Sequence, residues 1–590
     1  MGATSLSVSS DTSGEKPGPN VFWRQTKTQA LRRYRSVTQA NGLTLSAIVI
    51  AVLLTLPLFS VASSVFLDGK GTLDHLMQTV LGQYIRNTLA LFVMVGVGTA
   101  VIGVATAWLV TMCQFPGRRL LQWALILPLT VPAYVIAYAY TDFLQHPGFV
   151  QTLLRDLTGW GPRDYWFPNI RSLGGAGLIF TLVLYPYVYI LARAAFLKPP
   201  NSAFNASRTL GRGPWRAFFT ISLPMARPAI IGGMALALME TLADYGAVAH
   251  FGVPTFTTGI YRTWFAMGDR IGATQLAAGL VTFVFVLVAL ERINRGSARR
   301  SGPGLERQGE LFQLSGLRAW TATIACALPA CLGFLLPVAV LFELGLPHFH
   351  ILAEPRYVQL LSNSFTLALA GSLMAVMLAV LLAYAARLTP GSLTQTTNRI
   401  ASLGYAVPGS IVAVGILLPL AWFDTTLDSF MRDRFGISTG LLLTGSIMAL
   451  LYGYMVRFIA VALNATEASL SKVTPAMDGA ARTLGSGAGG TLLRVHMPII
   501  RGGLLGAGLI VFVDSLKELP ATLIMRPFNF DTLAVQAHRL ASDERLAQAA
   551  VPSLVIVAVA LLPVILISQQ ISRDSTRMVT RPQSSSLKSS

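Results

Sequence analysis

The chain has 590 residues, of which 53% are apolar and only 12% are charged, and its mean hydropathy is +0.59. These values exclude an ordinary soluble globular protein and place the chain in a membrane. The formal net charge of +19 would suit a nucleic-acid partner, but the basic residues are concentrated in particular loops, so we expect no nucleic acid.

Apolar stretches of about 20 residues recur along the chain, and each is long enough to cross a bilayer as a helix. They predict an all-α polytopic membrane protein with twelve spans. The spans of the first half are 43–66, 88–112, 120–139, 173–192, 228–250 and 274–290. Those of the second half are 320–342, 365–386, 400–422, 441–463, 502–524 and 549–567.

Lys and Arg predominate in the two tails, in a basic linker and in alternate loops, whereas the other loops carry balanced charge. Because basic loops stay in the cytoplasm, we expect both termini inside. The predicted organisation is a cytoplasmic tail (1–42), a six-span unit (43–290), a cytoplasmic linker (291–318), a second six-span unit (319–570) and a cytoplasmic tail (571–590).

The two units repeat one another in sequence. Asn87 matches Asn363 at an offset of 276 residues, and Val131-Pro132 matches Val407-Pro408 at the same offset. Because each unit has six spans, both enter the membrane in the same direction, as two parallel repeats related by a pseudo-twofold axis along the membrane normal. The space between them is the expected pathway.

One loop segment is also repeated: "ASRTLGRGPWRAFFTISLP" begins at Ala206, and "AARTLGSGAGGTLLRVHMP" begins at Ala480. In the second copy Thr474-Pro475 predicts a helix start, and Gly485 predicts its end. Gly211 is the matching stop in the first copy, and Pro214 begins a further short helix that reaches Pro224. The segment is either a helix presented to a partner or an amphipathic helix that only seals the loop.

Gly211 followed after nine residues by Ile221-Ser222-Leu223-Pro224, and Gly485 followed likewise by Val495-His496-Met497-Pro498, resemble the EAA loops of permeases of type I ABC importers, which have a MetI-like fold. The resemblance implies two coupling helices that dock on an ATPase. The residues that it assigns to docking are Ala206, Arg208, Leu210, Gly211, Ile221, Pro224, Ala480, Arg482, Leu484, Gly485, Val495 and Pro498. The acidic residue that names the motif is replaced by Asn205 and Gly479.

The chain has no G-x-x-x-x-G-K-[ST] loop to cradle nucleotide phosphates. We therefore expect a permease without enzymatic activity or a bound cofactor of its own. The resemblance implies that ATP and Mg²⁺ bind to a partner, a cytoplasmic ABC ATPase homodimer. It also implies that a periplasmic substrate-binding protein delivers the cargo and that the permease lies in a bacterial inner membrane.

Charged residues inside the spans are informative, since each costs about 2.5–3.5 kcal/mol at the bilayer centre. Glu240 and Asp244 are expected on one face of the fifth span, and Asp514 and Glu518 on the same face of the eleventh. The cations that can offset them are Arg457 and Lys517. The carboxylates should line an aqueous cavity between the halves, either contacting substrate or forming an ionic lock.

Tyrosines recur in equivalent spans, in "LYPYVY" around Tyr187 and in "LYGY" ending at Tyr454. They are candidates for the pathway, although an aromatic belt or simple packing is the simpler explanation of them. Carboxylate and phenolate oxygens are hard ligands that suit a small, highly charged cation. The predicted metal contact is transient, through Glu240, Asp244, Asp514 and Glu518, because a tight cage would trap the ion.

The stretch 239–265 and its counterpart in the second unit resemble the fused, two-unit permeases for ferric iron. The resemblance implies alternating access driven by ATP, with thiamine or another small organic cation as the alternative cargo. A secondary transporter fits the span count but has no use for paired coupling loops. A membrane enzyme would need a convergent catalytic set, and the sequence has no H-E-x-x-H or G-x-S-x-G motif.

Overall fold

The computed structural model describes residues 42–67, 71–197, 214–296 and 312–579. Within these ranges eleven helices are long and apolar enough to cross a membrane, and the number is twelve if one bent pair is a single span. Each predicted span overlaps one of these helices or the bent pair, so the all-α polytopic fold is confirmed. The described exception is a short parallel pair of two-residue strands, in which Cys113 pairs with Phe312.

The elements of each half are given in chain order, where η marks short 3-10 or π turns. In the first half they are α2 (Gly42–Ser64), α3 (Thr72–Thr79), α4 (Leu81–Met112), β1 (Cys113–Gln114), α5 (Arg118–Ala124), η1 (Leu127–Thr130), α6 (Ala133–Leu144), α7 (Phe149–Thr158), α8 (Leu173–Leu197), α10 (Pro214–Ala217), η2 (Phe218–Ser222), α11 (Leu223–Ala243), α12 (Gly246–His250), α13 (Phe256–Tyr261), η3 (Arg262–Ala266) and α14 (Arg270–Gly296).

The second half repeats this order closely. Its elements are β2 (Phe312–Gln313), α15 (Gly316–Ala330), η4 (Cys331–Leu335), α16 (Leu336–Gly345), η5 (Leu346–Ala353), α17 (Pro355–Leu388), α18 (Ser392–Ala401), η6 (Ser402–Ala406), α19 (Gly409–Phe435), α20 (Ile447–Leu470), α21 (Pro475–Thr483), α22 (Ala488–Thr491), η7 (Leu492–His496), α23 (Met497–Leu516), α24 (Pro520–Met525), α25 (Leu533–Ser542) and α26 (Leu546–Val579).

Equivalent residues make equivalent contacts in the two halves. The side chain of Asn87 donates to the backbone oxygen of Pro254 at 2.9 Å, and that of Asn363 donates to the backbone oxygen of Asp531 at 3.1 Å. Each bond ties the second helix of its half to the chain just before α13 or α25. The sequence repeat is therefore a repeat in three dimensions.

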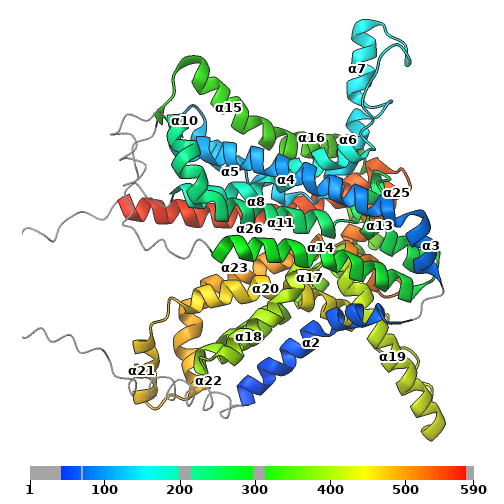
Figure 1. Cartoon of the computed structure of the whole chain (residues 1–590), viewed down its shortest axis with the longest axis vertical. Helices are drawn as coiled ribbons and strands as arrows, with labels where there is room; N and C mark the ends of the chain where they lie inside the picture. Colours follow the sequence, from blue (N-terminus) through cyan, green and yellow to red (C-terminus); the bar gives the residue numbers. More distant parts are fainter. Residues whose placement is uncertain (1–41, 68–70, 198–213, 297–311, 580–590) are drawn as a thin grey trace, which may run out of the picture.

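The first helix of each half packs on the other half. In Figure 1, α2 lies beside α18 and α19 of the second half, whereas α15 and α16 lie beside α5 and α6 of the first. A side-chain bond between the hydroxyls of Thr44 and Thr389, 3.1 Å long, joins α2 to the end of α17. The two sequence units are thus interlocked rather than simply adjacent.

The third span of each half is broken at its Val-Pro pair, so the predicted continuous helices 120–139 and 400–422 are wrong. Val131 and Val407 are extended, and the helix restarts after Pro132 or Pro408. The chain turns by 96° at the first break. Proline lacks the backbone N–H and disfavours a helical residue before it, which explains both breaks.

The fifth and eleventh spans also differ from the prediction. They begin earlier, because a π turn joins the loop helix to the span in the continuous helices Trp215–Ala243 and Ala488–Leu516. The predicted separate short helix before Pro224 is therefore wrong. They also end earlier, at Ala243 and Leu516 instead of 250 and 524. Each membrane helix thus stops in the middle of its charged motif.

The crossing of α2 and α19 predicts a stability effect. A Cβ on Gly415 would lie 2.5 Å from the backbone oxygen of Pro57, so Gly415→Val should destabilise the protein by about 1–3 kcal/mol through overpacking. The measurement is the melting temperature of the purified protein in detergent. Gly502→Val is the matched control, since nothing lies within 4 Å of its added Cβ. Equal melting temperatures for the two variants would contradict the close packing of α2 against α19.

Candidate functional site

A cavity lies between the two halves, where the ends of α11 and α23 meet the broken third span. Its volume is about 110 Å³, which is enough for several water molecules or a small ion. Its lining contains six charged side chains, Glu240, Asp244, Arg457, Asp514, Lys517 and Glu518. Aromatic side chains complete the wall, and they are Tyr134, Phe180, Tyr187, Tyr405 and Phe458.

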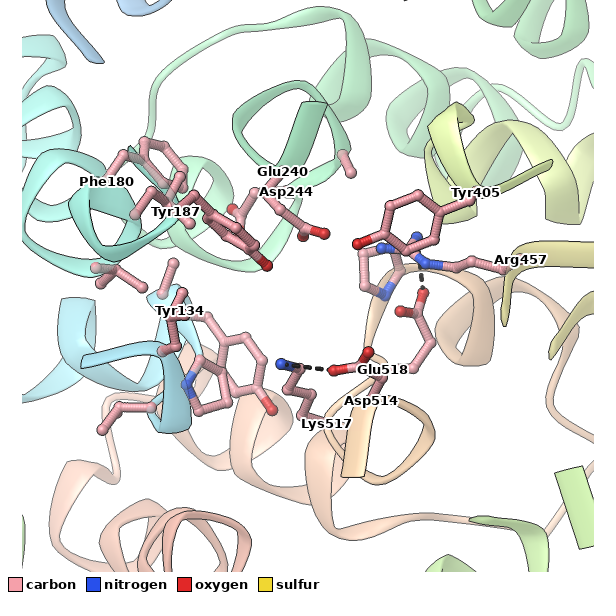
Figure 2. A pocket seen from close by; sticks show the side chains of 18 of the residues that line it. Tyr134, Phe180, Tyr187, Glu240, Asp244, Tyr405, Arg457, Asp514, Lys517 and Glu518 are labelled. Atoms are coloured by element: carbon pink, nitrogen blue, oxygen red, sulfur yellow. Dashed lines mark ion pairs between the residues drawn. The ribbon is translucent and has the colours of Figure 1, made fainter. Parts of the chain in front are cut away.

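The carboxylates of the second half are neutralised. Lys517 Nζ lies 2.9 Å from Asp514 Oδ1, and Arg457 Nη1 lies 3.3 Å from Glu518 Oε1, as Figure 2 shows with dashed lines. The Arg457 and Glu518 side chains are only 11% and 5% exposed. A Cβ on Gly409 would lie 2.4 Å from Glu518 Oε1, so the glycine leaves room for this pair.

The carboxylates of the first half have no such partners among the described residues. Asp244 follows the end of α11, and its Oδ1 accepts hydrogen bonds from the backbone N–H groups of Ala247 and Val248 at 2.8 and 3.4 Å. Neither Asp244 nor Glu240 forms an ion pair within the described chain. Counted as formal charges, four carboxylates against two cations leave the lining with an excess of two negative charges, on the side of the first half.

The structure brings most of the predicted pathway residues together. All six predicted charges and Tyr187 line the cavity, although their role in transport stays a prediction. The expected single helical face is wrong, because α11 and α23 end between the two acidic residues of each motif. Tyr454 is not in the lining, and its hydroxyl instead bonds the Thr522 hydroxyl at 2.7 Å.

Sequence reasoning missed two tyrosines of the lining. Tyr134 follows the Val131-Pro132 break, and Tyr405 precedes the Val407-Pro408 break. The Tyr134 hydroxyl is buried without a hydrogen-bond partner among the described residues. The repeated Val-Pro pairs were the available signal, because a break inside a membrane is tolerated only where it lines a cavity or is buried in protein.

The carboxylates do not form a ready-made metal cage. Within the described residues, no three His, Cys, Asp or Glu side chains are close enough to hold one ion together. The lining therefore offers separate oxygen groups rather than a closed coordination shell, which fits a passage better than a resident metal centre.

Contacts between the halves close the molecule at one end. Arg171 Nη1 lies 2.8 Å from Glu544 Oε1, and the Tyr138 hydroxyl bonds His538 Nδ1 at 3.0 Å. The Tyr261 hydroxyl also donates to the backbone oxygen of Pro520. At the other end of the molecule, α10 of the first half and α21 of the second half lie far apart in Figure 1.

The second repeated loop has the predicted form. Helix α21 starts with Pro475 after Thr474 and ends before Gly485, whose φ is +77°. The backbone N–H of Ser486 donates to Ala481 and that of Gly485 to Arg482, the pattern of a Schellman stop.

The other predicted docking residues fall in different places. Ala480, Arg482 and Leu484 are exposed. Val495 lies in η7, Ile221 lies in η2, and both Pro224 and Pro498 lie in the first turn of the following helix. The first-loop residues Ala206, Arg208, Leu210 and Gly211 lie outside the described residues.

Comparison with known proteins places these features in a family. The description "Binding-protein-dependent transport system inner membrane component" matches residues 99–300. A stretch of 209 residues is 32% identical to the molybdenum transport system permease protein of Escherichia coli K12 and covers 87% of that protein and 34% of this chain. The chain belongs to the family of binding-protein-dependent transport system inner membrane components.

Longer similarities cover both halves of this permease. Over 544 residues it is 25% identical to the Fe(3+)-transport system permease protein FbpB 2 of Haemophilus influenzae, covering 98% of that protein and 89% of this chain. Over 499 residues it is 22% identical to the ferric transport system permease protein of Actinobacillus pleuropneumoniae, covering 69% and 80% respectively. The permease is therefore a fused, two-unit inner-membrane subunit of the ABC transporter type.

The buried pair of Arg457 and Glu518 gives a prediction about stability. Arg457→Met leaves the Glu518 carboxylate buried without its cation, which should cost about 3–5 kcal/mol. The double variant Arg457→Met with Glu518→Gln removes both charges and should recover most of that loss. The melting temperatures of the two purified variants test this, and a double variant no more stable than the single one would contradict the pair's importance.

Proposed function

We propose that this permease moves ferric iron from a periplasmic binding protein into the cytoplasm, powered by a separate ATPase. The observation that carries the proposal is the cavity between the halves, whose lining has two surplus negative charges on Glu240 and Asp244. Similarity over nearly the whole length to an Fe(3+)-transport permease supports the choice of cargo. Carboxylate oxygens suit a small, highly charged cation.

The two halves contribute differently in this proposal. Glu240 and Asp244 attract the cation, since they have no ion-pair partners among the described residues. In the second half, Lys517 and Arg457 hold Asp514 and Glu518 in ion pairs and act as a lock between arrangements of the helices. The carboxylates of the first half thus contact the substrate, whereas those of the second half form an ionic lock. Iron passes as substrate and contacts the carboxylates only transiently.

The energy comes from two copies of a cytoplasmic ABC ATPase, which hold ATP and Mg²⁺, while this chain binds no cofactor. The α21 segment is well placed to dock one copy, because Leu484 at its end is 86% exposed and Gly485 fixes the turn. The first loop docks the other copy through Ala206, Arg208, Leu210 and Gly211.

Transport follows by alternating access. With α21 on the cytoplasmic side, as the positive-inside pattern predicts, the contacts of Arg171 with Glu544 and of Tyr138 with His538 lie toward the outer side and hold the halves together there. A loaded binding protein docks on the outer loops, and closure of the ATPase pair draws the coupling helices together. The halves then rock, the contacts of Arg171 with Glu544 and of Tyr138 with His538 separate, and the cavity opens outward.

An organic cation such as thiamine is the second candidate cargo. It is favoured by the aromatic side chains that line the cavity, above all Tyr134, Tyr187 and Tyr405, because the faces of such rings attract organic cations. The architecture and the energy source would be the same for either cargo, so uptake measurements separate the two candidates.

The cargo assignment predicts a charge-dependent uptake rate. Glu240→Gln with Asp244→Asn removes both surplus charges, and uptake of labelled ferric iron should fall about tenfold or more because the cavity no longer attracts the cation. The assay uses cells without their own iron importer that express this chain with its ATPase and binding protein. Asp433→Asn, on the exposed last turn of α19, is the matched control.

Three outcomes would revise the proposal. Unchanged iron uptake in the double variant would remove these carboxylates from the pathway. Uptake of labelled thiamine instead of iron by the unaltered chain would keep the architecture and replace the cargo. Iron uptake that persists with a catalytically dead ATPase would overturn the energy source.

The coupling loop gives a separate prediction. Gly485→Pro cannot adopt the φ of +77° and removes the bond from Gly485 N–H to Arg482, so it should disrupt the end of α21 and abolish transport without preventing membrane insertion. Uptake and the amount of ATPase that copurifies with the chain are the two readouts. The control is Gly479→Ala, because a Cβ there meets nothing within 4 Å. Normal uptake by Gly485→Pro would contradict the docking role.

A further inference from the structure

Asp478 on α21 joins three parts of the second half. Its Oδ2 accepts hydrogen bonds from Arg387 at the end of α17, from Nη2 at 2.8 Å and from Nε at 3.1 Å. Its Oδ1 accepts from His496 Nε2 at 2.6 Å, and His496 is only 1% exposed. Arg387 also donates to the backbone oxygens of Leu470 and Val473, which precede α21.

The cluster of Asp478, Arg387 and His496 is partly buried, and both carboxylate oxygens of Asp478 accept hydrogen bonds within it. The Arg387 and Asp478 side chains are 18% and 19% exposed. Burial alone would raise the pKa of Asp478, but the hydrogen bonds from His496 and Arg387 outweigh it and hold the pKa below its usual value. A carboxylate held by two partners from different helices fixes the position of α21 far better than an exposed ion pair would.

Helix α23 connects this cluster directly to the cavity. His496 immediately precedes α23, and Lys517 and Glu518 immediately follow it. A helix of 20 residues is about 30 Å long and rigid along its axis. Displacement of α21 therefore acts, through His496, on the element whose far end carries the pairs of Lys517 with Asp514 and Arg457 with Glu518.

The first half lacks these three residue types at the matching positions. At offsets of 274 and 276 residues, Phe204 stands for Asp478, Ser222 for His496 and Thr111 for Arg387. Phe, Ser and Thr side chains carry no charge, so these three positions cannot form the same ionic cluster in the first half.

We propose that Asp478 is a positioning residue that transmits movement of the second coupling helix, through His496 and α23, to the ion pairs of the cavity. The inference rests on the proposed ATPase docking but goes beyond it, because it assigns the transmission to one half. Asp478 touches neither the cargo nor the cavity. Its substitution should break the link between ATP hydrolysis and transport while both partners still bind.

The test uses the complete complex of permease, ATPase and loaded binding protein in proteoliposomes. Asp478→Asn keeps the shape and removes the charge, and we expect the iron transported per ATP hydrolysed to fall about tenfold. The amount of copurified ATPase and its unstimulated rate of hydrolysis should stay unchanged, which a merely misfolded loop would not permit. Glu467→Gln, at the exposed end of α20, is the matched carboxylate control, because the amide oxygen can still accept the hydrogen bond from Asn398.

A second pair of variants tests the contact between Asp478 and His496 without changing Asp478. His496→Gln keeps an N–H donor for the carboxylate and should retain more transport per ATP than His496→Leu, which keeps bulk without a donor. Equal values for this pair, normal coupling in Asp478→Asn, or loss of ATPase copurification in Asp478→Asn would each overturn the inference. An unaltered complex without ATP-dependent uptake would instead overturn the proposed function.

Discussion

Charge inside a membrane is the constraint on which the rest of this structure depends. Four carboxylates in two apolar helices would be costly in lipid, so the chain gathers them around one cavity between its halves. Helices α11 and α23 end within the charged motifs, which allows backbone N–H groups to solvate Asp244 and Glu518. The exchanged helices α2 and α15–α16 then cover the outside, so that the polar centre is surrounded by protein.

The two halves have similar backbones but different charged side chains. The backbone repeats faithfully, as the matching bonds of Asn87 and Asn363 show. The charges do not repeat, because Lys517 and Arg457 belong to the second half alone. Symmetry suits a rocking motion, in which both halves move alike. The unequal charges allow the first half to attract a cation, while the ion pairs of the second half hold the helices in place. The Asp478 cluster also lies in the second half.

Much of the fold followed from sequence, because hydropathy determines spans directly and a glycine such as Gly485 has a local reason to end a helix. The convergence of Glu240, Asp244, Asp514 and Glu518 was also predictable, since lipid exposure would be so unfavourable. The helix exchange was not predictable, because α2 is apolar all round and its partner depends on shape. The contacts of Asp478 were not predictable either, because its partners Arg387 and His496 are distant from it in sequence.

The two cations in the cavity have a reason in the proposed importer. A trivalent ion facing four free carboxylates would be held too strongly to leave, since unit charges about 4 Å apart interact by about 4 kcal/mol at an effective dielectric constant of about 20. Lys517 and Arg457 cancel two of those charges, so a loaded cavity becomes slightly positive rather than negative. The ion is then attracted by Glu240 and Asp244 and repelled by the cations Lys517 and Arg457. A passage needs this balance, because conduction requires that entry be favourable and exit remain easy.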